Sequence, residues 1–146
     1  MKRLTVACLI SLAVVAHAGK PVKGRDLGAK LVSRAVDLVG EGGGYIHDIP
    51  PSPRRDESGL ARYLAKRMVW YRDYGRQKRA KDAPVIVISD DPAVAARVAR
   101  LAFSSLRAGS LRGLRVICII GKQYDSYLRS VANVTGAQLQ VEALPQ

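Results

Sequence analysis

The sequence has few residues of the kinds that form disulfides or metal sites. It contains two cysteines, Cys8 and Cys118, and two histidines, His17 and His47. Cys8 and His17 lie in an N-terminal segment that we expect to be removed, which leaves one residue of each type. This excludes a disulfide within the mature chain. It also excludes a metal site built from several histidines. Because neither a disulfide nor such a metal site is available, the hydrophobic core must stabilise the fold.

Aromatic residues are also scarce, at 5% of the chain with a single tryptophan. Cys118 lies in the apolar run 116–120, which predicts a buried strand and a structural thiol rather than a nucleophile. His47 precedes a proline-rich segment and has no nucleophile-elbow motif near it. The glycine run 40–44 lacks the spacing of a nucleotide-binding loop. We therefore expect no catalytic triad and no cofactor.

The first eighteen residues have the layout of a secretory signal peptide. Lys2 and Arg3 precede an apolar run at 4–15, and the segment ends in a small-x-small triplet at 16–18. The run is about 12 residues long, whereas a transmembrane helix needs roughly 20. We predict a signal peptide at 1–18 and a periplasmic or secreted protein with no transmembrane segment after cleavage.

Basic residues outnumber acidic residues twofold, with 24 lysines and arginines against 12 acids. Cleavage would remove Lys2 and Arg3 and leave 22 against 12, a formal charge of +10. Such a charge favours an anionic partner: an envelope protein, an anionic polymer or, as a less favoured choice, nucleic acid. The alternative is that the charge serves only solubility in a protein rich in arginine.

The pattern of elements predicts a single α/β domain at 19–146. An apolar, β-branched run at 84–89 and a second run at 114–120 indicate strands buried on both faces. Helical patterns at 58–80, 92–106 and 124–135 alternate with these strands and with a last strand at 137–141. On the helix from 92 we place Val94, Val98, Leu101 and Ser105 on one side. We expect a small three-layer α/β/α sandwich with a mainly parallel sheet of three to four strands.

The N-terminal part of the domain is less regular. A first helix is expected from a cap at Asp26 to about Val39. The Gly/Pro-rich segment 40–57 is predicted to be flexible, with a short strand at 45–49.

Polar residues follow the two buried strands. Asp90 and Asp91 come after the first strand and Lys122 after the second, where parallel sheets place ligands. These acids are weak candidates for a metal site, and with the lysine they could orient a phosphate. The alternative is that the acids cap the next helix and offset its dipole.

The helix at 58–80 carries the strongest candidate for a binding surface. Tyr63, Trp70 and Tyr74 project to one side of it with Arg67 among them, and Arg72 and Arg76 add further positive charge. Aromatic rings interleaved with arginines can stack on a ligand while the charges hold an anion. The alternative is an amphipathic helix whose long basic side chains cover the sheet.

Together these features favour an exported, non-enzymatic envelope protein. We expect an accessory or partner-binding module of an envelope assembly such as a secretion or conjugation apparatus. Its candidate binding residues are Arg67, Trp70, Arg72, Tyr74, Arg76 and Lys122. Two alternatives stay open: a small phosphate- or metal-dependent enzyme that uses the strand-end acids, and a polyanion or nucleic-acid binder that uses the basic aromatic helix.

Overall fold

The computed structural model describes residues 24–50, 56–78 and 83–146, so the predicted signal peptide lies outside the described residues. Short 3-10 turns at Gly40–Gly42 and Lys122–Tyr124 precede β1 and α4. The helices and strands are α1 (Gly24–Val39), β1 (Tyr45–Asp48), α2 (Glu57–Lys78), β2 (Val85–Ile88), α3 (Pro92–Ser104), β3 (Arg115–Ile119), α4 (Asp125–Thr135) and β4 (Gln138–Glu142).

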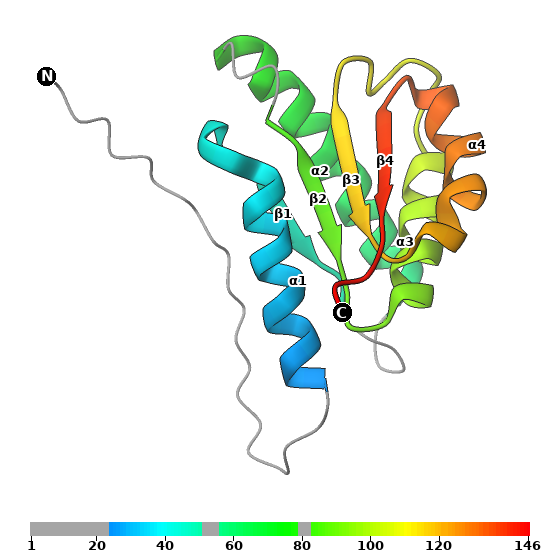
Figure 1. The fold of residues 1–146 in the computed structure, drawn as a ribbon. Helices are drawn as coiled ribbons and strands as arrows, with labels where there is room; N and C mark the ends of the chain where they lie inside the picture. Colours follow the sequence, from blue (N-terminus) through cyan, green and yellow to red (C-terminus); the bar gives the residue numbers. More distant parts are fainter. Residues whose placement is uncertain (1–23, 51–55, 79–82) are drawn as a thin grey trace, which may run out of the picture.

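The four strands form one parallel sheet in the order β1-β2-β3-β4. Each strand therefore pairs with the strand before it in the chain. A right-handed crossover between neighbours places its helix on the same face each time, and α2, α3 and α4 all cover one face (Figure 1). The first helix is not a crossover, and α1 covers the other face. The predicted three-layer α/β/α class is confirmed, with three helices on one face and one on the other.

Two hydrophobic clusters, one on each face, hold the layers together. On the three-helix face, Val85, Val87 and Cys118 pack against α2, α3 and α4. On the α1 face, Leu31 and Ala35 of the helix pack on side chains of the two central strands, Ile86, Ile88, Ile117 and Ile119. The strand residues are almost completely buried, as predicted for the two apolar runs, because each central strand is covered on both faces.

The helix α3 corrects one expectation. Val94 and Val98 are buried as predicted, but Leu101 is 45% exposed and Ser105 is exposed as well. The sequence pattern therefore placed Leu101 and Ser105 on the wrong side of the helix. Because α3 lies between α2 and α4, small side chains line most of its buried surface: Ala95, Ala96, Ala99 and Ala102.

The short strand predicted at 45–49 is confirmed as β1, and the 3-10 turn at Gly40–Gly42 precedes it. Residues 51–55 lie outside the described residues. Gly44 brings the turn close to the sheet, because a Cβ there would meet Val39 Cγ2 at 2.8 Å and the Pro84 carbonyl oxygen at 2.9 Å. The first helix begins at Gly24, so Asp26 lies in its first turn rather than at its cap and forms an ion pair with Lys30 at 3.1 Å.

Candidate partner-binding surface

A row of four side chains runs along one side of α2. Tyr63, Arg67, Trp70 and Tyr74, which we call the aromatic row, follow the spacing i, i+4, i+7 and i+11, and this spacing keeps them on one side of a helix. Tyr63 is 54% exposed, Trp70 48% and Tyr74 36%. The rings of Trp70 and Tyr74 are stacked, with centroids 5.0 Å apart. The structure thus brings together Arg67, Trp70 and Tyr74, the three residues of the row that the sequence analysis names as candidate binding residues.

Arg67 lies at the centre of the aromatic row. Its Nε donates a hydrogen bond to the Tyr63 hydroxyl at 3.2 Å. Its guanidinium carbon lies 5.6 Å from the ring centroids of both Tyr63 and Trp70, within the range of cation–π attraction. Among the described residues it forms no salt bridge with a carboxylate. The aromatic neighbours hold the guanidinium in place, and no carboxylate in the described part of the chain neutralises its charge.

Two side chains of β1 pack against α2 beside the aromatic row. The Tyr45 ring stacks on Tyr71 of α2 with centroids 3.7 Å apart. His47 lies 5.5 Å from Tyr71 and 6.2 Å from Tyr63, ring to ring. Burial lowers the pKa of His47 to about 4, and the charge of Arg67 adds to the shift. The imidazole is therefore neutral at ordinary pH, and its buried Nε2 has no hydrogen-bond partner among residues 24–50, 56–78 and 83–146.

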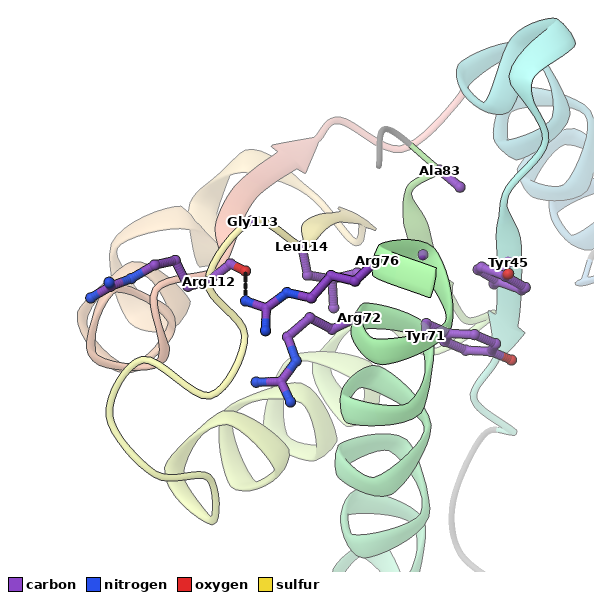
Figure 2. Close-up of a pocket in the computed structure, with 9 residues that line it drawn as sticks. Tyr45, Tyr71, Arg72, Arg76, Ala83, Arg112, Gly113 and Leu114 are labelled. Atoms are coloured by element: carbon purple, nitrogen blue, oxygen red, sulfur yellow. Dashed lines mark hydrogen bonds between the residues drawn. The ribbon is translucent and has the colours of Figure 1, made fainter. Parts of the chain in front are cut away.

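The two other arginines nominated on this helix have a different environment. Arg72 donates to the Ser110 carbonyl oxygen and to Asp73 Oδ1, and Arg76 donates to the Arg112 carbonyl oxygen at 3.2 Å. Both guanidinium groups thus tie the turn 109–113 to α2, on the opposite side of the helix from Tyr71 and Tyr45 (Figure 2).

A cavity of about 250 Å³ lies between these contacts and the stacked pair of Tyr45 and Tyr71. The Arg112 side chain points away from it, and Gly113 and Leu114 close it (Figure 2). The cavity is at the amino ends of the strands, whereas parallel sheets usually bind ligands at the carboxyl ends.

At the carboxyl ends, the predicted acids serve separate purposes. Asp91 Oδ1 accepts hydrogen bonds from the backbone N–H groups of Ala93 and Val94, both at 3.2 Å, and so caps α3. Asp90 lies against Gly28 of α1, where a Cβ would approach its Oδ1 to 3.2 Å. Partial burial raises the pKa of Asp48, and the nearby Asp90 carboxylate raises it further.

The predicted lysine lies nearer to other acids. Hydrogen bonds from Gln140 and Arg34 lower the pKa of Glu142, and the charge of Lys122 contributes to the same shift. Within the described part of the chain, no three histidine, cysteine or acidic side chains gather as metal ligands would. The cavity beside Tyr45 and Tyr71 is not lined by Asp90, Asp91 or Lys122.

The thiol of Cys118 lies in a buried strand, as the sequence predicts. Cys118 is completely buried in β3, and burial raises its pKa to about 12. The thiol is therefore protonated and inaccessible, which fits a structural residue.

Sequence reasoning missed the role of β1 in the site. Tyr45 and His47 are two residues apart in β1, so their side chains lie on the same face of the strand, the face toward α2. This spacing was visible in the sequence. Their contact with Tyr71 was not predictable, because it depends on how α2 packs across the strand.

Comparison with known proteins gives no further assignment: the chain matches no protein-family model, no curated protein and no solved structure. No helix in the described ranges is both long and apolar enough to cross a membrane.

Proposed function

We propose that this protein is an exported, non-enzymatic module that binds an acidic partner protein of the bacterial envelope through the aromatic row. The observation that carries the proposal is the exposed Tyr63 and the exposed, stacked pair of Trp70 and Tyr74 around Arg67, which has no carboxylate partner among the described residues. Tryptophan, tyrosine and arginine are the residues most enriched among binding hot spots.

The geometry of the row supports binding rather than a purely structural role. Its rings are held by one another and by Arg67, so little side-chain entropy remains to be lost when a partner binds. A cluster of exposed rings on one helix is costly in water unless another surface covers it. The signal-like sequence at 1–18 supports the proposed location in the envelope.

The charge around the row supports an acidic partner. Arg62 and Lys66 lie on the same helix and are exposed, and Arg62 meets Asp56 only at 3.7 Å across the surface. The polyanion alternative relies on more of the helix, but Arg72 and Arg76 already donate to backbone carbonyl oxygens. This favours a protein partner that uses the aromatic surface over a polymer that needs a line of free cations.

The test compares two exposed aromatic–arginine pairs on the same protein. Trp70→Ala removes the ring that stacks on Tyr74 and lies beside Arg67, whereas Tyr127→Ala removes a ring on α4 that lies 4.5 Å from the Arg100 guanidinium carbon. We expect cross-linking in intact cells, read by mass spectrometry, to recover one envelope protein with the wild type and with Tyr127→Ala. Recovery should fall about tenfold with Trp70→Ala, as for a hot-spot residue.

Equal recovery with both variants would contradict the proposal. Recovery of nucleic acid or anionic polymer instead, with an affinity for heparin that falls steeply with salt, would favour the polyanion alternative. The enzyme alternative stays a prediction for the strand-end residues Asp90, Asp91 and Lys122.

A further inference from the structure

The outer edge of β1 carries backbone groups that no described strand uses. In the described sheet β1 pairs only with β2. The N–H of Tyr45 donates to the Pro84 carbonyl oxygen at 2.9 Å, and that of Ile49 donates to the Ile88 carbonyl oxygen at 2.8 Å. Alternate residues of a parallel strand direct their N–H and C=O groups to opposite sides. The groups of Ile46 and Asp48 therefore point away from β2, toward the open edge.

Exposed apolar surface flanks this edge on the α1 face. A hollow of about 360 Å³ lies there, lined by Val36, Val39, Ile46, Glu41 and glycines of the turn before β1. Val36 is 51% exposed although it lies on the helix that covers the sheet. The hollow suits an apolar side chain, and Glu41 at its margin disfavours an acidic one.

The aromatic row flanks the same edge on the opposite face. The helix α3 packs against α2, Arg72 and Arg76 of α2 contact the turn that follows α3, and His47 of β1 approaches Tyr63 of the row. The row therefore lies beside the edge of β1 that faces away from β2. This side carries the positive charge of Arg67 and suits an acidic side chain.

We propose that the open edge of β1 binds an extended segment of the partner as a fifth strand, with acidic and apolar side chains in alternation. The acidic side chains face the aromatic row, and the apolar ones face the hollow beside Val36. Successive side chains of a strand point to opposite faces, so a single strand meets both surfaces at once. Strand addition of this kind takes affinity from backbone hydrogen bonds and specificity from the side-chain sites. The inference rests on the proposed function, since it assigns a binding mode to the same surface.

Charge favours a partner segment over a second copy of this chain. Two copies joined through β1 would bring two α2 helices side by side, each with Arg62, Lys66 and Arg67. Like charges placed in this way oppose association. The chain as a whole carries a formal charge of +12, which adds to the repulsion between copies.

The experiment uses a labelled peptide of four Glu-Val repeats and a control peptide of the same composition with its four glutamates before its four valines. We expect the alternating peptide to bind at least about tenfold more tightly than the control, by fluorescence anisotropy at low salt. Equal binding, or no binding of either peptide, would overturn the proposal.

Backbone pairing is tested by changing the peptide and leaving the protein intact. Methyl groups on one alternate set of peptide amide nitrogens would face β1, and those on the other set would face solvent. We expect one methylated peptide to lose about tenfold or more in affinity and the other to keep its affinity. Equal effects of the two methylation patterns would exclude strand pairing.

Two protein variants make the same comparison at β1. Asp48→Pro removes the outward N–H, at an edge position where proline is tolerated, and Asp48→Ala removes only the side chain. We expect the proline variant to bind the alternating peptide about tenfold more weakly than the alanine variant. If their affinities are equal while Trp70→Ala still loses binding, strand addition is wrong and the proposed use of the aromatic row stands. If the protein forms a dimer that Asp48→Pro dissociates, the occupant is a second copy and the proposed partner segment is wrong.

Discussion

His47 packs against two tyrosines, and this packing makes its protonation unfavourable. It is the only histidine in the described residues, and it packs between Tyr71 and Tyr63 rather than facing solvent. Burial and the charge of Arg67 lower its pKa to about 4. Folding therefore favours the neutral imidazole, and protonation opposes the packing of β1 against α2.

This gives a pH-dependent stability. Between the unfolded pKa of 6.5 and the folded pKa of about 4, the unfolded chain binds a proton that the folded chain does not. The contribution is complete above pH 6.5 and is lost as the pH falls through this window. We expect the wild type to lose about 2 kcal/mol more than His47→Gln between pH 7.5 and pH 4.5, measured by urea denaturation. Parallel losses in the two proteins would contradict the shifted pKa.

Single helices and strands were largely predictable, because their signals are local. The start of α3 is an example: capping by the acids was one of the two interpretations of this segment, and Asp91 is the N-cap of α3. The side on which Leu101 lies was not predictable, because two neighbouring helices cover α3 and sequence periodicity describes only one buried stripe.

The two consecutive aspartates before α3 are expected to differ in their effects on stability. Asp91→Ala removes the acceptor for the N–H groups of Ala93 and Val94 and should lower the free energy of unfolding by about 1 kcal/mol. Asp90→Asn removes a charge that raises the pKa of Asp48 and should change stability by less than about 0.5 kcal/mol. Chemical denaturation of both variants checks the difference. A larger loss at Asp90 would indicate that its carboxylate makes a contact the fold requires.

For the whole molecule, the sequence predicted the class of fold but neither the strand order nor the uneven layers. Wholly apolar strands such as β2 indicate cover on both faces. They do not say that one helix covers one face and three cover the other, because that follows from the direction in which each crossover adds its strand. The aromatic row was found from the helix alone, whereas its position beside the open edge of β1 depends on that strand order.

The central position of β3 predicts strong protection of Cys118. Its thiol is completely buried, and burial raises its pKa to about 12, so a thiol reagent reaches it only when the sheet opens. In a Cys8→Ser chain we expect the labelling rate of Cys118 to follow global unfolding, with the same dependence on urea. Labelling that is fast and independent of urea would show that β3 opens locally.

The order of the strands has a consequence for how the chain can reach this structure. Each described strand pairs with its immediate predecessor, and the paired residues lie 23 to 40 positions apart along the chain. A chain that emerges N-terminus first can extend the sheet one strand at a time without parting strands already joined. The sheet can thus begin to form before its last strand, β4, has been synthesised.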